Sequence, residues 1–322
     1  MVEYMHDGQL PKLGFGTGVF SGRYNAFECD QATDLVRTSL ELGVNYFDTS
    51  PYYNDSEIIL GDALHAIRAD HPRDTYYLAT KVGRYGHTAQ DFDYSADRVN
   101  QSITQSLQRL HTDYLDIGLC HDVEFVRQSD VTDHALPELF RLKHQGTVRM
   151  VGISGYPLDT LLTIAQVQHA KNEHLDVVMS YCHYNLHNQM LATYAPKFRA
   201  AGVRFVINAS PLSMGLLRDD ANSPPHWHPA CAPLKRAAAN ARAFCQEQHH
   251  SLASVALAYS FAQTVFDCTV VGISSKPELE DAVRQYKTVA SGRHAIDRQT
   301  QKVTDCLLEI FEPFKSYTWP SP

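Results

Sequence analysis

The chain of 322 residues lacks the features that mark disulfide-rich, membrane-spanning and nucleic-acid-binding proteins. Its seven cysteines are scattered without a Cys-x-x-Cys pair, so we expect reduced thiols rather than a disulfide framework or a zinc site. It has no run of Lys and Arg, and its net charge of −8 argues against a surface for nucleic acid or anionic lipid. The longest apolar region, Leu252–Phe266, contains polar residues and is too short to span a bilayer.

The sequence also lacks low-complexity linkers and internal repeats that would divide it into separate units. An ordinary apolar fraction of 44% is enough for a sizeable core. We therefore expect one domain over residues 1–322. The first residues, Met1–Asp7, carry neither a basic start nor an apolar stretch, so we expect no secretory signal and a cytoplasmic location.

Strand-like and helix-like segments alternate along the chain. Periodicity predicts eight strands, at Leu13–Thr17, Val44–Asp48, Tyr76–Val82, Tyr114–His121, Val148–Ser154, Asp176–His183, Val203–Ala209 and Cys268–Ser274. These strands are nearly continuous apolar runs, as expected when helices cover both faces of a parallel sheet. Eight such strands, each followed by a crossover, predict an α/β fold of the (β/α)₈ TIM barrel type.

The glycine-rich run Gly14–Gly18 superficially matches a dinucleotide-binding fingerprint. However, Ser21–Asn25 follows it instead of a helix start, and no acidic residue ends the next strand at the required place. We assign the run to the first barrel strand, with Gly16 and Thr17 facing the site. The proline-rich stretch Arg218–Cys231, which follows the seventh strand, is interpreted as a lid or excursion.

Four residues with complementary chemistry fall at or just beyond strand ends: Asp48, Tyr53, Lys81 and His121. Reactive groups of a TIM barrel gather at the carboxyl ends of its strands. A phenol can exchange a proton, a neighbouring ammonium lowers its pKa, a carboxylate holds the ammonium, and an imidazole orients a substrate oxygen. The alternative is a plain Asp48–Lys81 ion pair beside a core tyrosine. The order and placement of all four favour a hydride-transfer site.

Several motifs extend this pattern to a family resemblance. They are Gly43–Tyr53, Ser56–Gly61, Ala79–Lys81, Leu115-Asp116 leading to His121, Gly152–Ser154 and Ser210–Leu217. Together they resemble the aldo-keto reductase superfamily from about Leu13 to Val283. Segments such as Pro72–Tyr76, Thr80–Arg84 and His121–Val126 are similar in particular to its NAD-dependent aldose 1-dehydrogenases, which act on D-arabinose or L-galactose.

This resemblance implies that Tyr53 transfers the proton with help from Lys81 and Asp48, and that His121 fixes the substrate oxygen. Ser154 is expected to bind the nicotinamide carboxamide. Two positions depart from the commoner pattern. Gly155 stands where an Asn is usual, and Ala209 stands where a tyrosine usually stacks on the nicotinamide. We assign the stacking role to Tyr181.

Cofactor contacts are expected from the strand ends, the Ser210–Leu217 backbone and the segment after the last strand. Exposed backbone N–H groups at Ser210–Leu217 suit a pyrophosphate. A carboxylate at Glu278 would repel a 2′-phosphate and accept from a ribose diol, which favours NAD, although Lys276 argues the other way. The predicted cofactor residues are Gly16, Thr17, Asp48, Ser154, Tyr181, Ser210, Leu212, Met214, Gly215, Ser274, Glu278 and Asp281.

Sugar hydroxyls need polar partners, with an apolar wall beside them. The predicted substrate residues are Tyr52, Asp122, Glu124, Phe125 and His183. His183 and His187 are four residues apart, but they bracket a strand end and have no evident third ligand, so no metal site is expected.

The sequence therefore predicts an enzyme that oxidises an aldose at C1 with NAD⁺, giving the aldonolactone. The resemblance implies D-arabinose, L-galactose or L-fucose as substrate and a role in ascorbate or erythroascorbate synthesis. We expect a small-molecule sugar partner and a monomer or weak dimer. The alternatives are an NADPH-dependent aldehyde or ketone reductase of the same fold and a non-catalytic subunit that senses nicotinamide redox state.

Overall fold

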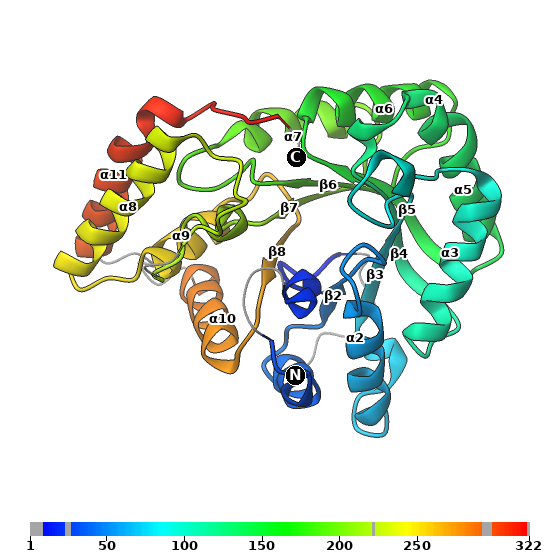
Figure 1. Cartoon of the computed structure of the whole chain (residues 1–322), viewed down its shortest axis with the longest axis horizontal. Coiled ribbons are helices and arrows are strands. Elements are labelled where there is room, and N and C mark those ends of the chain that lie inside the picture. Colours follow the sequence, from blue (N-terminus) through cyan, green and yellow to red (C-terminus); the bar gives the residue numbers. More distant parts are fainter. Residues whose placement is uncertain (1–8, 23–26, 221–222, 292–297, 321–322) are drawn as a thin grey trace.

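Eight parallel strands form a closed barrel in chain order (Figure 1). The computed structural model describes residues 9–22, 27–220, 223–291 and 298–320, so the expectation for Met1–Asp7 lies outside the described residues. The predicted (β/α)₈ fold is confirmed, and each predicted strand is present: seven have slightly shorter bounds, and the fifth is one residue longer. The strands are β1 (Leu13–Gly16), β2 (Tyr46–Asp48), β3 (Tyr77–Val82), β4 (Leu115–His121), β5 (Val148–Gly155), β6 (Val177–Tyr181), β7 (Phe205–Ala209) and β8 (Cys268–Gly272).

Helices surround the barrel, and most of them bury an apolar stripe against its strands. Their bounds are α1 (Ala32–Glu41), α2 (Ser56–Ala66), α3 (Ala96–Arg109), α4 (Gln128–Asp130), α5 (Leu136–His144), α6 (Leu158–Ala170), α7 (Met190–Ala200), α8 (Ala232–Glu247), α9 (Leu252–Phe261), α10 (Lys276–Ala290) and α11 (Arg298–Phe311). Ser95 caps α3 and Ser275 caps α10, each through a side chain that accepts a backbone N–H.

Strand register aligns the residues that the sequence singles out. Gly16 pairs with Asp48 between β1 and β2, and His121 pairs with Ser154 between β4 and β5. Lys81 pairs with Leu119 near the same ends of β3 and β4. Because all strands are parallel, their carboxyl ends open on one side of the barrel.

Three hydrophobic clusters hold this arrangement. One fills the barrel interior with side chains such as Tyr46, Leu119 and Met179. A larger one lies between the strands and the surrounding helices. The third is built from α8, α9, α11 and the chain end around Trp319, and α8 and α11 lie side by side in Figure 1.

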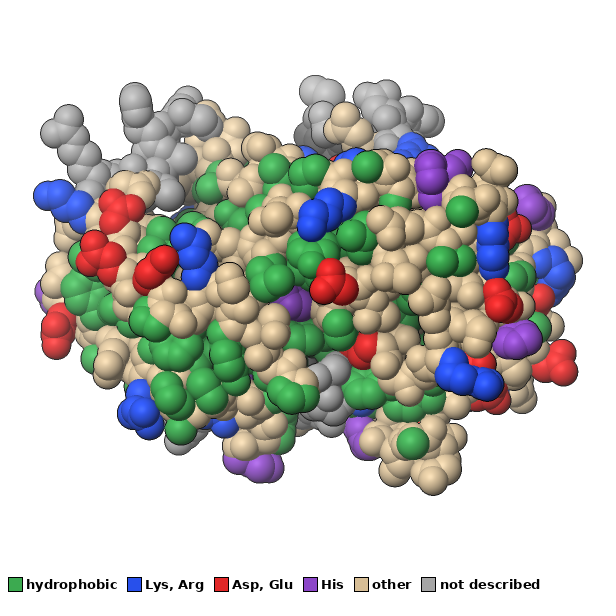
Figure 2. Space-filling model, turned by 90° about the horizontal axis from the view of Figure 1, so that it is seen from above, with side chains coloured by type: hydrophobic (Ala, Val, Ile, Leu, Met, Phe, Trp, Pro, Cys, Tyr) green, Lys and Arg blue, Asp and Glu red, His purple; other side chains and the backbone are tan. Residues whose placement is uncertain are grey.

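Acidic, basic and hydrophobic side chains are interspersed on the face shown in Figure 2. Within the described ranges, none of the helices combines the length and the apolar character that crossing a bilayer requires.

Candidate active site

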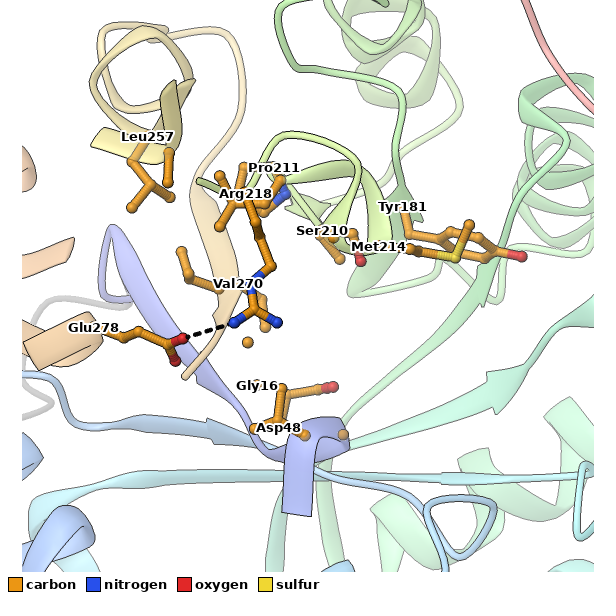
Figure 3. Close-up of a pocket in the computed structure, with 18 of the residues that line it drawn as sticks. Gly16, Asp48, Tyr181, Ser210, Pro211, Met214, Arg218, Leu257, Val270 and Glu278 are labelled. Carbon is orange, nitrogen blue, oxygen red and sulfur yellow. Dashed lines mark hydrogen bonds and ion pairs between the residues drawn. The ribbon is translucent and has the colours of Figure 1, made fainter. Parts of the chain in front are cut away.

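A cavity of about 780 Å³ lies at the carboxyl ends of the strands. Each strand end contributes a residue to its wall: Gly16, Asp48, Lys81, His121, Ser154, Tyr181, Ala209 and Val270. Figure 3 shows several of these side chains around the open space. A cavity of this size is in the range of ligand pockets, about 300–1,000 Å³.

Lys81 joins Asp48 and Tyr53 at the floor of this cavity. Its Nζ lies 2.5 Å from Asp48 Oδ1 and 2.9 Å from the Thr49 carbonyl oxygen. The same Nζ is 4.9 Å from the centroid of the Tyr53 ring. Asp48 and Lys81 are both buried, so each supplies the charge that makes burial of the other tolerable. The structure thus brings together three of the four residues that the sequence places at or beyond strand ends.

The pKa of Tyr53 departs from the expected direction. Burial raises this pKa well above its usual value, the carboxylates of Asp48 and Asp122 raise it further, and the Arg84 guanidinium lowers it. The expectation that Lys81 brings the phenol below its ordinary pKa is therefore wrong for this structure. The reason is that Asp48 offsets the charge of the Lys81 ammonium, while burial penalises the phenolate.

His121 completes the group of four. Its ring lies 5.6 Å from the Tyr53 ring, and its Nδ1 lies 3.0 Å from Ser50 Oγ. Burial lowers the pKa of His121 well below its usual value, and the nearby cations Lys81 and Arg84 lower it further. The imidazole is therefore neutral. The tautomer that accepts at Nδ1 from Ser50 keeps an Nε2–H available to donate to a substrate oxygen.

Arg84 is a wall residue that sequence reasoning missed. Its Nη1 lies 2.5 Å from Asp122 Oδ2, and its guanidinium carbon is 3.8 Å from the centroid of the Tyr52 ring. Arg84 follows Lys81 by three residues in a motif already noted for its resemblance, but no spacing rule shows that its side chain turns inward.

Most of the predicted cofactor residues line the cavity. They are Gly16, Asp48, Ser154, Tyr181, Ser210, Leu212, Met214, Gly215, Glu278 and Asp281. The described wall also contains residues that were not predicted, from the loop after β7 and the starts of α9 and α10: Arg218, Asp219, Asp220, Trp227, Ser251, Ser254 and Arg284. Four of them, Arg218, Asp219, Asp220 and Trp227, belong to the Arg218–Cys231 stretch, so this stretch contributes to the wall, and its role as a lid stays a prediction.

Thr17 and Ser274 are corrections, because neither lines the cavity. Thr17 begins a 3₁₀ turn after β1, and its buried hydroxyl donates to the Asp48 carbonyl oxygen at 3.0 Å. Ser274 instead donates both its backbone N–H and its hydroxyl to Glu278 Oε2, at 2.7 and 2.8 Å. Both residues therefore hold a wall residue in place by hydrogen bonds, Thr17 to Asp48 and Ser274 to Glu278, without lining the cavity themselves.

The cofactor end of the cavity carries charges of both signs. Arg218 Nη2 lies 3.5 Å from Glu278 Oε1 across the opening (Figure 3), and Arg284 pairs with Asp281. Including Asp219 and Asp220, this end has four carboxylates and two guanidinium groups, a formal balance of −2. The argument from Lys276 loses force, because its ammonium pairs with Asp34 on α1, 2.5 Å away, and is not in the wall.

The loop after β7 is tightly turned. Ser210, Ser213, Met214 and Gly215 all have positive φ values, between 50° and 94°. The N–H groups of Ser210, Ser213 and Gly215 donate to the carbonyl oxygens of Val270, Ser210 and Leu212, so they are used within the protein. Ser210, Met214 and Gly215 also line the cavity. Contact between this loop and a pyrophosphate therefore stays a prediction, supported by the place of these residues in the wall.

The departure at Gly155 has a steric reason. A Cβ at this position would lie 2.5 Å from Glu124 Oε2. Glu124 Oε1 in turn accepts the Tyr156 backbone N–H at 3.1 Å. An asparagine at position 155 would therefore require the carboxylate of Glu124 to move.

The predicted substrate residues divide into two groups. Tyr52 and Asp122 line the cavity, whereas Glu124, Phe125 and His183 do not, and these three are corrections. Glu124 binds backbone as described above, and Phe125 packs on Phe92 with ring centroids 5.2 Å apart.

His183 is turned into the protein interior. Its Nδ1 lies 2.9 Å from Ser180 Oγ and its ring packs on Tyr156, 4.4 Å between centroids. Burial lowers the pKa of His183 to about 4. Within the described residues there is also no group of three or more His, Cys, Asp or Glu side chains arranged to hold a metal ion.

Comparison with known proteins agrees with the site. The profile of the aldo/keto reductase family matches residues 12–295. The chain is 39% identical to L-galactose dehydrogenase from Arabidopsis thaliana, over 97% of this chain and 94% of that protein. It is 40% identical to D-arabinose 1-dehydrogenase from Saccharomyces cerevisiae, over 89% of this chain and 86% of that protein.

A solved structure shows the same architecture. The holo form of an aldo-keto reductase from Bacillus halodurans superimposes with a TM-score of 0.65 and 25% identity, covering 91% of each chain. Sequence motifs, barrel topology and the arrangement of the site therefore point to one family.

Proposed function

This chain belongs to the aldo/keto reductase family, and from that premise we propose that it oxidises the C1 hydroxyl of a cyclic aldose with NAD⁺, yielding an aldonolactone and NADH. The observation that carries the proposal is the set of Asp48, Tyr53, Lys81 and His121 around one cavity. Its support lies in two relatives at about 40% identity that bear the names of aldose dehydrogenases. D-arabinose, L-galactose and L-fucose are the proposed substrates.

The roles follow from the contacts of the side chains. The nicotinamide of a bound cofactor would supply the acceptor for the C1 hydride, and Tyr53 as phenolate would accept the proton of the anomeric hydroxyl. The carboxylate of Asp48 holds Lys81 with its Nζ 4.9 Å from the centroid of the Tyr53 ring. The neutral imidazole of His121 donates from Nε2 to the reacting oxygen and so positions C1.

NAD is the proposed cofactor rather than NADP. A 2′-phosphate would enter a region where four carboxylates outnumber two guanidinium groups. Glu278 is held there by Ser274 and Arg218, so its carboxylate has a fixed position from which to accept a ribose hydroxyl. Arg218 and Arg284 are each engaged by a carboxylate, which weakens their attraction for an additional phosphate.

The direct test incubates the purified protein with NAD⁺ or NADP⁺ and each of the three aldoses, and follows the absorbance of the reduced cofactor. We expect turnover with NAD⁺ to exceed turnover with NADP⁺. The matched variant Tyr53→Phe should lower kcat by at least about 10²-fold, the scale of general acid–base catalysis, with NAD⁺ affinity nearly unchanged. Wild-type turnover only in the reverse direction, with NADPH and an aldehyde, would favour the reductase alternative.

We also propose a cytoplasmic enzyme that acts as a monomer or weak dimer on free sugars, in a route to ascorbate or its five-carbon analogue. This setting is supported by the family resemblance. Size-exclusion chromatography with light scattering tests the oligomeric part, and a stable higher oligomer would contradict it.

A further inference from the structure

Arg84 is held in one position at the end of the cavity near Tyr52 and His121. Its side chain is only 10% exposed, and its guanidinium lies 3.8 Å from the Tyr52 ring centroid and 5.3 Å from those of Phe92 and Phe125. Its Nε donates to the Gly86 carbonyl oxygen at 3.3 Å. A guanidinium clamped between three rings loses little conformational entropy when it binds a ligand.

One nitrogen of this guanidinium makes no hydrogen bond within the described part of the chain. Nη1 is used by Asp122 Oδ2, at 2.5 Å, and Nε by Gly86, whereas Nη2 has no hydrogen-bond partner among the described residues. The same holds for the second oxygen of Asp122, Oδ1. An unused donor and an unused acceptor therefore belong to one buried ion pair in the wall of the cavity.

The pair is also next to the reacting group. Asp122 Oδ2 lies 3.5 Å from His121 Nε2, and the Tyr52 ring under Arg84 is 5.5 Å from the His121 ring and 5.9 Å from the Tyr53 ring. The pair is therefore close enough to His121 to reach hydroxyls on the carbons next to C1 in a sugar whose C1 oxygen His121 holds. Two adjacent hydroxyls can accept from a guanidinium and donate to a carboxylate at the same time.

We propose that Arg84 and Asp122 recognise the C2 and C3 hydroxyls of the aldose, Arg84 as donor through Nη2 and Asp122 as acceptor through Oδ1. The proposal rests on the proposed aldose dehydrogenase function and assigns its substrate specificity to this pair. A site built to bind a hydroxyl discriminates strongly against an analogue without it, because its buried polar atoms are then left without partners.

Arg84→Lys is the informative variant, because a lysine keeps the positive charge beside Asp122 but lacks the second nitrogen. We expect kcat/KM for D-arabinose to fall by about 10- to 100-fold, the usual effect of losing a hydrogen bond to a charged group. For 2-deoxy-D-ribose, the 2-deoxy analogue of D-arabinose, we expect a much smaller change. The preference for D-arabinose over the deoxy sugar should shrink accordingly.

Two further variants accompany it. The double variant Arg84→Gln with Asp122→Asn removes both charges, so neither is left buried alone. Its preference for D-arabinose over 2-deoxy-D-ribose should also shrink. The control is Arg37→Lys, because Arg37 is an exposed arginine on α1 that pairs with Asp70. This variant should leave kcat/KM unchanged for both sugars. Titration of each variant with NAD⁺, followed by fluorescence, confirms that the cofactor end is folded.

If the Arg84 and Asp122 variants lose kcat/KM equally for the two sugars, or lose none for either, the assignment of Arg84 and Asp122 is wrong. The dehydrogenase proposal would stand in that case. A wild-type protein that binds NAD⁺ but oxidises none of the aldoses would instead overturn the proposed function, and this inference with it.

Discussion

At the residue scale, the site depends on two buried ion pairs that differ in how completely their atoms are used. Lys81 is bound by Asp48 and by the Thr49 carbonyl, so its position is fixed. Arg84 is bound by Asp122 but retains an unused nitrogen. The first pair therefore determines geometry at the phenol, and the second presents hydrogen-bonding groups to the cavity.

Removing Lys81 should destabilise the protein more than removing a surface lysine. In Lys81→Met the Asp48 carboxylate stays buried without a counter-charge, which costs about 3–5 kcal/mol of unfolding free energy. The deficit should shrink as pH falls, because burial already raises the pKa of Asp48 and protonation then removes the charge. Urea unfolding at several pH values measures this.

Lys171→Met provides the control, because Lys171 pairs with Asp133 at the surface and should contribute no more than about 1 kcal/mol. Similar losses for the two variants would show that the Asp48–Lys81 pair adds no stability beyond that of an exposed pair.

Aldose oxidation should be faster at higher pH. Tyr53 accepts a proton only as phenolate, and burial raises its pKa, so the active fraction grows as pH rises toward that pKa. His121 adds no opposing change at neutral pH, because its lowered pKa keeps it neutral. The measurement is kcat/KM for D-arabinose over about pH 6–10. This range lies below or at the ordinary tyrosine pKa of about 10, so kcat/KM should rise across all of it. A rate that climbs on acidification would exclude Tyr53 as the base.

At the scale of elements, strand ends and helix contacts place these side chains. The 3₁₀ turn after β1 (Thr17–Ser21) links Thr17 to Asp48 and Ser56, which ties β1, β2 and α2 together below the site. Helix α2 then packs closely on the end of α3 at Gly61. A Cβ on Gly61 would lie 2.0 Å from the Arg109 carbonyl oxygen and 2.8 Å from Leu110 Cα.

Gly61→Ala should therefore destabilise the protein despite the better helix propensity of alanine. Overpacking against backbone costs about 1–3 kcal/mol, or occasionally more, and the propensity gain of about 1 kcal/mol offsets only part of it. We expect a net loss of about 1–2 kcal/mol in urea unfolding. Asp62→Ala, next in the helix and solvent-exposed, is the control and should change stability by no more than about 0.5 kcal/mol. An alanine at Gly61 that leaves the midpoint unchanged would mean that α2 and α3 separate at no cost.

At the scale of the whole molecule, the cavity joins residues from all eight strand ends with the loop after β7 and the starts of α9 and α10. Ligand binding there therefore connects parts of the chain that are far apart in sequence. A ligand that binds only the folded state stabilises it by about 2.7 kcal/mol at 100 times its Kd.

NAD⁺ should accordingly raise the melting temperature more than NADP⁺ at equal concentration, because the cofactor end carries a formal balance of −2. Thermal unfolding with each nucleotide measures the difference. Glu278→Gln keeps an oxygen that accepts from Ser274 but removes one negative charge. In this variant the difference between the melting-temperature shifts with NAD⁺ and NADP⁺ should be smaller. A larger shift with NADP⁺ in the wild type would contradict the proposed cofactor.

The sequence by itself determined the barrel and the four residues at its mouth. The period and spacing of apolar segments along the chain indicate which residues are buried. Eight parallel strands joined by crossovers leave few topologies other than a closed barrel. Asp48 and His121 are the last residues of their strands and Lys81 is the last but one, so the fold alone brings them together. Tyr53 follows β2 within a short loop, which limits where it can lie.

Tertiary structure alone decided which loop side chains reach the cavity. Glu124 accepts the Tyr156 backbone N–H, Phe125 packs on Phe92, and His183 bonds to the Ser180 hydroxyl, so these three do not line the cavity, whereas the loop residues Arg84 and Arg218 do. It also decided the pKa of Tyr53, which burial raises first, the carboxylates of Asp48 and Asp122 raise further, and the Arg84 guanidinium lowers. Side-chain direction in loops and desolvation arise from packing across the whole fold, and neither leaves a periodic signal along the chain.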